Sequence, residues 1–396
     1  MSELGIALRF LRGRRLAGLL TALSVALAVA LIVASVVLAR GVRTAFVEGT
    51  TDYNLVVGAK GSATQLVMSV VFRLDTPLPN IRVSSYEGLR EDRRIEVAVP
   101  VALGDAYRGF RYVATTSAYF APAPWRRTTL AVTAGRWFRD DPPGQPSHEA
   151  VLGAEAARRT GLRLGDRFYE GEEMAAHPLT VVGILGPGRG ADDRAIFISL
   201  ASYWDMNEIA RATSDKPLTA VLVRPRRMSD LPGLHRQLNL ADDTQAAFPS
   251  VVLLTIFNLL DVAEDVMALV LALVAIVSGL GLAVSMYRAT WERRREIATL
   301  RALGAGRPAI LRIVVLECGL LATAGAVTGV VGGEALAYAG ARVLAGRLGV
   351  VADPLALGWP PLAVLVATML VGTLAGLLPA LTAHRLDVAE HLAPVS

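Results

Sequence analysis

Histidine is the side chain best suited to hold a metal ion or to move a proton near neutral pH. The chain has five: His148, His177, His235, His384 and His391. No two of them have the H-E-x-x-H spacing that puts two imidazoles on one helix face around zinc. The one close acidic neighbour, Glu149, follows His148 directly and would point the other way along a strand. The spacing therefore predicts no metal site and no catalytic histidine.

Phosphate binding is the second chemistry to consider. A P-loop requires Gly-Lys before Ser or Thr, and the two lysines, Lys60 in "GAKGS" and Lys216 in "SDKPL", stand in other contexts. The glycine-rich segment 186–197, "GPGRGADDRAIF", follows a predicted strand without a helix behind it, so it reads as a turn between strands. We therefore expect the chain to bind no cofactor and to hydrolyse no nucleotide itself.

Two carboxylates, Glu317 and Glu334, fall in or near an apolar run, where an ionisable group is costly and suggests proton coupling. The alternative is ion pairing at the two ends of a membrane span. Glu317 would then pair with Arg312 or Arg288 on the inner side, and Glu334 would face Arg342 or water on the outer side. We favour this second interpretation.

The elements that position these residues are mostly membrane helices. Hydrophobic residues make up 53% of the 396 residues and mean hydropathy is positive, which points to a membrane protein. Four apolar runs reach the length of about 20 residues that a bilayer core requires. The predicted spans are 16–39, 266–287, 313–341 and 360–383. The predicted fold is four transmembrane helices, arranged one plus three, with a mixed α+β extracytoplasmic domain at 40–265.

Arginine clusters set the orientation. They precede the first span at Arg9, Arg12, Arg14 and Arg15, and follow the second at Arg288, Arg293, Arg294, Arg295, Arg301, Arg307 and Arg312. The positive-inside rule then places 1–15, 288–312 and the tail 384–396 in the cytoplasm, and 40–265 and the short loop 342–359 outside. The net charge of +5 lies at membrane borders, which excludes nucleic acid as a partner. The first apolar run is longer than that of a signal peptide and has no cleavage site, so we expect an uncleaved anchor.

Short β-branched runs such as "RIEVAVPVAL" and "HPLTVVGIL", separated by Gly, Pro and Asp, indicate strands in the outer domain. Residues 40–49 would continue the first membrane helix outward, and 248–267 would lead into the second, as two helical stalks. The single cysteine, Cys318, falls in the third span, so no disulfide framework is expected.

One apolar patch in the outer domain has two interpretations. Leu66, Val67, Val70, Val71 and Phe72 lie close together, with Met68 beside them, in "SATQLVMSVVFRLDTPLPNI". A buried helix would make them core; an exposed one would make them a membrane-facing or lipid-binding surface. Burial is the more common case.

Small residues recur at helical spacing in three spans and would let helix backbones approach closely. They are Ala22, Ala26, Ala30 and Ala34 in the first, Gly325, Gly329 and Gly333 in the third, and Gly372 and Gly376 in the fourth. These ridges suit either packing within the chain or a dimer seam.

The cytoplasmic loop "WERRREIATLRALGA" is patterned as a short amphipathic helix. Its apolar stripe is Ile297, Leu300 and Leu303, and Gly304 is a candidate C-cap. The charged residues around the stripe are Glu292, Arg293, Arg294, Arg295, Glu296 and Arg301. Such a helix would lie at the inner membrane face, or would seat its stripe in a groove of a cytosolic partner.

Two segments, "ERRREIATLRALGA" and "GLLPALTAHRLDVAEHL", resemble the FtsX/MacB-like permease family of ABC transporters, in which a Gly-rich membrane helix follows the first motif. Ala298 stands where the family often has Gly, and Val388 where it often has Pro. In the outer domain, "EAVLGAEAARRTGLRLGDRF" and "LTVVGILGPGRGADDRAIFISLASYW" resemble the family's periplasmic core domain. The resemblance thus extends over nearly the whole chain.

The resemblance implies a multi-pass permease subunit of the bacterial inner membrane that is not itself an enzyme. It would work as a homodimer, with the first and second helices at the interface, beside two cytosolic ATPase subunits that carry the ATP and Mg. Residues 292–305 would be the coupling helix that meets the ATPase. Membrane lipid and a periplasmic adaptor, lipoprotein or hydrolase are the other partners to consider.

Three functions remain open. The complex would export or extract a lipoprotein, peptide or hydrophobic small molecule, or it would transport nothing and activate a cell-wall hydrolase, as in the FtsX-like division branch. The size of the insert favours export. A four-span receptor without an ATPase would require the coupling motif to be accidental.

Overall fold

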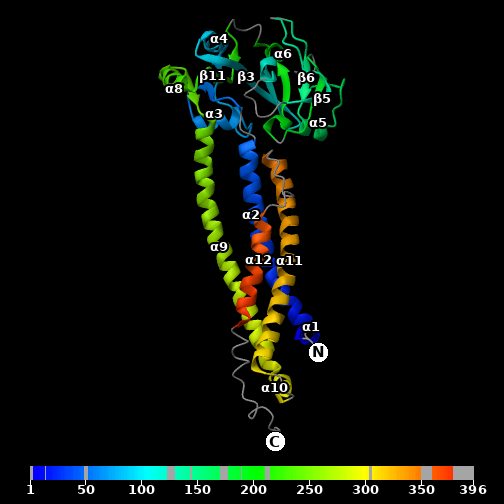
Figure 1. Ribbon diagram of the computed structural model, residues 1–396. Coiled ribbons are helices and arrows are strands. Elements are labelled where there is room, and N and C mark those ends of the chain that lie inside the picture. Colours follow the sequence, from blue (N-terminus) through cyan, green and yellow to red (C-terminus); the bar gives the residue numbers. More distant parts are fainter. Residues whose placement is uncertain are drawn as a thin grey trace. The chain divides into compact units, whose positions relative to one another are not determined.

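The computed structural model describes residues 3–13, 15–48, 52–122, 130–142, 145–169, 177–188, 190–209, 215–302, 306–348 and 359–377. The chain divides into two compact units (Figure 1). The helical unit comprises Met1–Val42, Leu260–Val343 and Ala352–Ser396, and the α/β unit comprises Arg43–Leu259 and Leu344–Val351.

Long helices build the helical unit. They are α1 (Glu3–Gly13), α2 (Arg15–Glu48), α9 (Pro249–Glu292), α10 (Arg294–Ala302), α11 (Arg307–Leu348) and α12 (Trp359–Ala375). Among the described residues, three helical stretches are long and apolar enough to cross a membrane: Arg15–Thr44, Pro249–Glu292 and Pro308–Leu344. The apolar α12 has 17 residues, and the rest of the predicted span 360–383 lies outside the described residues. Three of the four predicted spans are therefore supported, and the fourth stays a prediction.

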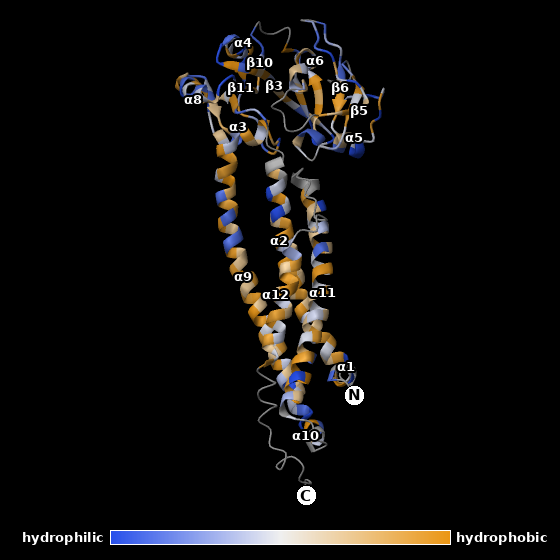
Figure 2. Ribbon diagram, viewed as in Figure 1, coloured by the Kyte–Doolittle hydropathy of each residue, from blue (hydrophilic) through white to orange (hydrophobic). Residues whose placement is uncertain are grey.

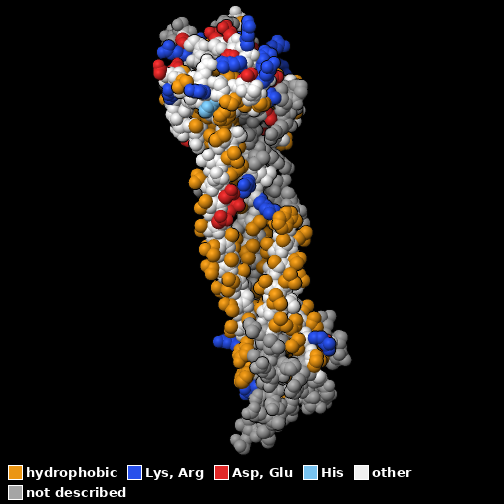
Figure 3. Space-filling model, turned by 60° about the vertical axis from the view of Figure 1, so that its left-hand side comes forward, with side chains coloured by type: hydrophobic (Ala, Val, Ile, Leu, Met, Phe, Trp, Pro, Cys, Tyr) orange, Lys and Arg blue, Asp and Glu red, His pale blue; other side chains and the backbone are white. Residues whose placement is uncertain are grey.

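The surface of the helical unit is apolar over much of its length (Figures 2 and 3). On α9, for example, Leu269, Leu273, Ile276, Val277 and Leu280 are each more than half exposed. A contiguous apolar surface of this kind is unfavourable in water and favourable against lipid chains.

Two helices extend beyond their predicted membrane spans, as the stalk prediction requires. The helix α2 continues to Glu48, and α9 begins at Pro249 and runs without a break to Glu292. Each of these helices has residues in both units. Helix is therefore present at 40–48 and 249–267, residue 49 lies outside the described residues, and the role of these segments as stalks stays a prediction.

The α/β unit is built on one large sheet. Its strands are β1 (Leu55–Ala59), β2 (Ile81–Arg82), β3 (Ile95–Tyr107), β4 (Phe110–Thr115), β5 (Val132–Gly135), β6 (Glu149–Leu152), β7 (Arg167–Phe168), β8 (Leu179–Leu185), β9 (Ile196–Ser199), β10 (Pro217–Leu218), β11 (Ala220–Pro225) and β12 (Thr244–Ala247). In the described part of the chain, ten strands form one sheet in the order β12-β1-β11-β3-β4-β9-β6-β8-β5, with β7 paired to β8, while β2 and β10 pair separately. The neighbours β4 and β9 are parallel, as are β6 and β8.

Both faces of this sheet are covered. The unit's helices are α3 (Ala63–Val70), α4 (Val83–Glu91), α5 (Ala154–Thr160), α6 (Leu200–Met206) and α8 (Leu231–Leu240). Along β9, Ile196 and Ile198 belong to one hydrophobic core and Phe197 to another, as the alternation of a strand requires. Residues of α4, α5, α6 and α8 join the first core, and residues of α3 and the first turn of α9 join the second. The predicted mixed α+β domain is therefore a covered sheet with two cores.

The apolar patch of the sequence lies in the second core. Leu66, Val67, Val70, Val71 and Phe72 are all buried, and Leu66 and Val67 have no exposed surface. The core interpretation is confirmed, and the lipid-binding alternative for these residues is wrong.

A buried ionic cluster follows this patch directly. Arg73 Nη2 donates hydrogen bonds to Asp192 Oδ1 at 2.7 Å and to the Tyr119 hydroxyl at 3.2 Å, and that hydroxyl donates to Asp192 Oδ1 at 2.8 Å. Burial by itself would lower the pKa of Arg73, but the charge of Asp192 and these hydrogen bonds raise it overall. Burial, and then the charge of Asp192, raise the pKa of Tyr119. The cluster holds a charged guanidinium inside the α/β unit.

Candidate functional site

The predicted coupling segment connects two long helices of the helical unit. The helix α9 ends at Glu292, Arg293 occupies a turn, and α10 runs from Arg294 to Ala302 before α11 begins at Arg307. The predicted short helix is therefore present. Leu303 and Gly304 lie outside the described residues, as do the side chains of Leu300 and Arg301, so the C-cap and that part of the stripe stay predictions.

Arg293 fastens the turn to its surroundings. Its Nη1 donates to both carboxylate oxygens of Glu317 on α11, at 3.1 and 3.2 Å, and its Nη2 donates to the Phe10 carbonyl on α1 at 3.1 Å. The guanidinium also lies over the Phe10 ring, 4.6 Å from its centroid. The side chains of Arg293 and Glu317 are 11% and 6% exposed, so this ion pair is shielded from water.

The same contact gives Glu317 a partner beside the expected Arg312 or Arg288. Arg312 instead pairs with Glu3 at 2.7 Å. Glu317 pairs with the residue in the turn because the turn brings Arg293 back to α11. Glu317 is therefore ion-paired and is not an isolated acid.

At the other end of α11, Glu334 is partly buried. Arg342, its expected partner, donates to the Tyr338 hydroxyl, and its guanidinium lies 4.6 Å from the centroid of that ring. The pairing of Glu334 with Arg342 or with water therefore stays a prediction.

The apolar side of α10 faces α11. Ile297 is buried and packs against Ile310, and the neighbouring Ala298 is buried as well. The backbone N–H of Ile297 donates to the Arg293 carbonyl at 3.0 Å, so the residue in the turn accepts a helical hydrogen bond from α10. Ile297 therefore anchors α10 within the chain, and its predicted contact with a cytosolic partner stays a prediction.

A polar side of α10 remains exposed. It consists of Arg295, Glu296 and Thr299 of α10 together with Glu292, the last residue of α9, and we call these four residues the exposed face of α10. Arg295, Glu296 and Thr299 recur at helical spacing, so their side chains project from one side of α10. Arg294 lies 5.0 Å over the half-exposed ring of Trp291 next to this face. Anchoring on one side and charge on the other suit a rigid element that docks through ion pairs and hydrogen bonds.

The predicted small-residue ridges meet inside the chain. The backbone atoms nearest to a Cβ built on Gly325, Gly329 and Gly333 of α11 are the carbonyl oxygens of Ala22, Ala26 and Ala30 of α2, at 2.8, 2.7 and 2.8 Å. A real Cβ does not fit at such distances, so glycine is needed where these helices cross. Ala34, the next residue of the alanine row, is partly buried.

Gly372 of α12 and Gly376, which directly follows that helix, serve the same purpose. A Cβ on Gly372 would clash with the Ala322 methyl group, and one on Gly376 would lie 2.7 Å from both Cβ and Sγ of Cys318. Both contacts are with α11. The intrachain interpretation thus accounts for these ridges, and a dimer seam elsewhere on the helical unit stays a prediction.

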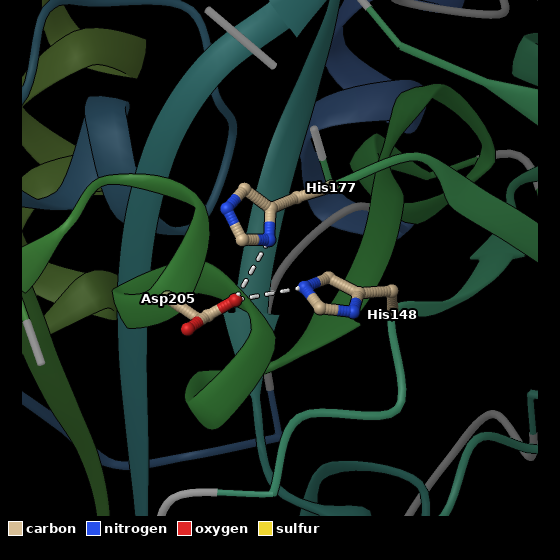
Figure 4. Close-up of side chains that lie close together, drawn as sticks. All are labelled: His148, His177 and Asp205. Carbon is tan, nitrogen blue, oxygen red and sulfur yellow. Dashed lines mark hydrogen bonds and ion pairs between the residues drawn. The ribbon is translucent and has the colours of Figure 1, made fainter. Parts of the chain in front are cut away.

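In the α/β unit, the side chains of His148, His177 and Asp205 lie close together, although their spacing in the sequence did not group them (Figure 4). Asp205 Oδ2 lies 3.1 Å from His148 Nε2 and 2.9 Å from His177 Nδ1, and the two imidazole centroids are 5.3 Å apart. One donor atom from each residue lies within 4.8 Å of the other two, so the three could hold a metal ion together.

Sheet topology explains why residue spacing along the sequence did not predict this cluster. His148 directly precedes β6, and His177 lies two residues before β8, its parallel neighbour, so both residues lie at the same end of the sheet. The Thr180 N–H of β8 donates to the His148 carbonyl at 2.8 Å. The helix α6 starts at this end too, because β9 is antiparallel to β6. Predicting the cluster would have required knowing that β6 and β8 are parallel neighbours.

Family models match both parts of the sequence. The MacB-like periplasmic core domain matches residues 19–240, and the FtsX-like permease C-terminal model matches residues 268–388. The chain is 26% identical over 273 residues to an uncharacterized ABC transporter permease, MJ1507, of Methanocaldococcus jannaschii, covering 66% of this chain and 65% of that protein. It is also 35% identical over 117 residues to the macrolide export ATP-binding/permease protein MacB of Rhodopirellula baltica, covering 29% of this chain and 16% of that protein.

Solved structures of periplasmic or extracellular regions are also similar. The periplasmic region of MacB from Actinobacillus actinomycetemcomitans matches with a TM-score of 0.39 and 13% identity, covering 54% of this chain and 96% of that one. The extracellular domain of the transporter YknZ from Gram-positive bacteria matches with a TM-score of 0.33 and 16% identity, covering 49% of this chain and 99% of that one.

Proposed function

Because the chain belongs to the ABC transporter permeases with a MacB-like periplasmic core domain and an FtsX-like C-terminal region, we propose that it couples a separate cytosolic ATPase to shape changes of its α/β unit. The family makes it a membrane protein with a periplasmic domain, which is the α/β unit. The ATPase partner, the coupling path and the substrate are the proposed part.

The geometry of α10 carries the proposal. In the chain, α10 follows the long apolar helix α9 and precedes the long apolar helix α11. The Arg293–Glu317 pair and the Ile297–Ile310 contact hold α10 against α11. Its exposed face offers two carboxylates, a guanidinium and a hydroxyl for docking. A partner that moves this helix would therefore move both flanking helices with it.

The helix α9 offers a path for that movement. It is continuous from Glu292 back to Pro249, and its first turn places Val252 and Leu253 in a core of the α/β unit. A helix transmits displacement along its axis because its backbone hydrogen bonds resist stretching and bending. A shift at the coupling end would thus reach the periplasmic domain without passing through a flexible linker.

We propose further that the working complex is a homodimer in the bacterial inner membrane with both termini in the cytoplasm and four spans per chain. The sequence has no P-loop lysine, which supports placing ATP and Mg on the partner. The arginine clusters at the membrane borders support the orientation.

Export of a hydrophobic small molecule is the first candidate for the transported substrate. The Rhodopirellula relative is named for macrolide export, which supports this class. The burial of Leu66, Val67, Val70, Val71 and Phe72 removes the apolar surface that would have suited a lipid, lipoprotein or hydrophobic peptide. Extraction of a lipoprotein or peptide, and activation of a cell-wall hydrolase without transport, are the alternatives that a co-purified periplasmic protein would identify.

Co-purification from native membranes in mild detergent tests the coupling proposal. The informative variant exchanges Arg295 and Glu296 (Arg295→Glu with Glu296→Arg), which preserves net charge on the exposed face. The matched control exchanges Arg90 and Glu91, an adjacent exposed pair on α4. We expect mass spectrometry to find a P-loop ATPase with the native chain and the control, and little or none with the Arg295/Glu296 exchange. Absence of an ATPase from all three would refute the proposal and favour a receptor.

A further inference from the structure

We propose that His148, His177 and Asp205 form a binding site for a divalent transition-metal ion of the zinc class. Two imidazoles and one carboxylate are a ligand set that zinc accepts, and three protein ligands leave one coordination position for water or another ligand. None of the features that define the coupling proposal belongs to this site, so the two stand or fall separately.

Two of the three distances between the donor atoms are already close to those of a zinc site. Zinc binds nitrogen and oxygen ligands at about 2.0–2.2 Å, so the donor atoms of a tetrahedral site lie about 3.4 Å apart. The Asp205 oxygen is already 3.1 Å from His148 Nε2 and 2.9 Å from His177 Nδ1, and all three donor atoms lie within 4.8 Å of one another. An ion would enter by widening these two contacts by a few tenths of an ångström and by bringing the two imidazole nitrogens, which lie within 4.8 Å, to a similar separation.

Exposure of the three side chains is intermediate. Their exposed fractions are 21% for His148, 31% for His177 and 26% for Asp205. Water and ions can therefore reach the donor atoms, while most of each side chain is enclosed by the fold. Two histidines and an acid in this setting differ from a loose surface group, whose ligands would have to be ordered on binding.

The carboxylate is positioned by the core. Leu200, Tyr203 and Met206 of α6 are buried in the core that holds Ile196, which fixes the helix on the sheet. Ser202 and Asp205 are three residues apart on α6 and so lie on one face. The Ser202 hydroxyl accepts a hydrogen bond from the His148 backbone N–H at 3.0 Å, and Asp205 meets the imidazole of the same residue. One face of α6 thus contacts both the backbone N–H and the imidazole of His148.

His148 has a special backbone conformation. Its φ is 52°, in the left-handed region that few residues other than glycine occupy. Hydrogen bonds at both its N–H and its carbonyl, to Ser202 and Thr180, maintain this conformation. Such backbone outliers concentrate at functional sites, where surrounding structure holds a side chain in one direction. Here the direction is toward Asp205 and His177.

A second set of hydrogen bonds supports the site from behind. Ser202 Oγ donates to Asp141 Oδ2 at 3.2 Å, and Ser199, the N-cap of α6, accepts from the Ser202 N–H at 3.1 Å. Networks that orient ligand-bearing segments are a regular feature of metal sites and preserve their geometry. An ion at this position would link three separate segments: the start of β6, the residues before β8, and α6.

The competing account is an ion-paired cluster, in which Asp205 simply bridges two imidazoles. It predicts no selective metal affinity. The test uses the full chain, purified in detergent with a tag that contains no histidine and stripped with EDTA. Zn²⁺ is then titrated in competition with a chromophoric chelator, with Mg²⁺ as the comparison ion because it prefers oxygen ligands.

The variants are His148→Asn, His177→Gln and Asp205→Asn, with His235→Gln as the matched control. Asparagine suits the left-handed backbone of residue 148. His235 lies in the same unit but stacks on Phe248, 4.5 Å between centroids, away from the cluster. The two tail histidines are present in every protein compared. Thermal melting of the stripped proteins shows whether each variant is folded.

We expect one Zn²⁺ per chain to bind tightly to the native protein and to His235→Gln, with no competition from Mg²⁺. Each ligand variant should lose at least about 100-fold in affinity, the upper end of the loss seen when only a supporting residue is removed. Zn²⁺ should also raise the melting temperature of the native chain and of the control, but not of the ligand variants. Equal affinity in all folded variants, or no selective binding by the native chain, would leave the ion-paired cluster as the correct account. Should His148→Asn fail to fold, His177→Gln and Asp205→Asn decide the question.

Discussion

The close crossing of α2 and α11 predicts that alanine at position 329 opens the helix bundle. A Cβ at Gly329 would lie 2.6 Å from Val29 Cβ and 2.7 Å from the Ala26 carbonyl oxygen. Carbon atoms in favourable contact are about 3.5–4.0 Å apart, so the two helices must separate locally by about 1 Å. Overpacking of this size typically costs about 1–3 kcal/mol. Gly332→Ala is the control, because its added methyl group would lie 3.8 Å from the nearest atom, Ala30 Cβ.

The single cysteine supplies the assay. Cys318 has no exposed surface and lies on α11 itself, so a thiol-reactive fluorogenic dye labels it only when the bundle opens. When opening and closing are fast, the labelling rate follows the open population. A cost of about 1–3 kcal/mol then corresponds to a rate increase of about 5- to 140-fold for Gly329→Ala.

Gly325→Ala, Gly329→Ala and Gly333→Ala together should cost much less than three times the single change, because one displacement of the helix relieves all three clashes. Gly332→Ala should label at close to the native rate. Equal labelling of Gly329→Ala and Gly332→Ala would refute the close crossing of α2 and α11.

Three further outcomes follow from particular contacts. Glu317→Gln leaves a buried guanidinium without its counter-charge, so we expect a loss of about 3–5 kcal/mol in bundle stability, measured by the same thiol labelling. Asp192→Asn removes the counter-charge of Arg73 inside the α/β unit and should destabilise that unit while leaving the Cys318 labelling rate unchanged, as hydrogen exchange of the two units would show. Hydrogen bonds from Ser84 lower the pKa of Asp215 below its ordinary value. The stability that Asp215 contributes is therefore present above about pH 4 and is lost as the pH falls through the lowered pKa. Asp215→Asn should make the acid unfolding curve of the full chain flatter below about pH 4.

The elements that follow a simple period were predictable. The apolar runs, the continuation of α9 back through the stalk, and the amphipathic α10 all follow from residues a few positions apart. The small-residue ridge of Gly325, Gly329 and Gly333 was recognisable for the same reason. Its partner was not, because a ridge on one helix is compatible with several neighbours.

Contacts between distant segments were not predictable. The pairing of Glu317 with Arg293 depends on the turn after Glu292, and charge proximity along the chain suggested other arginines instead. The buried state of Leu66 depends on the sheet beneath α3, which a local pattern does not reveal. His148, His177 and Asp205 meet only because β6 and β8 are parallel neighbours and α6 begins at the same end of the sheet.

Site-specific cross-linking at the exposed face of α10 tests the central claim most directly. Thr299 and Thr255 are both exposed helical threonines whose hydroxyls donate to the carbonyl four residues back, at 2.9 and 3.1 Å, so they form a matched pair. Each is replaced by cysteine in a Cys318→Ala background and labelled with a photoactivatable cross-linker in native membranes. We predict that a P-loop ATPase is captured at position 299 and not at position 255. Capture of no ATPase at 299, or equal capture at both positions, would contradict the account.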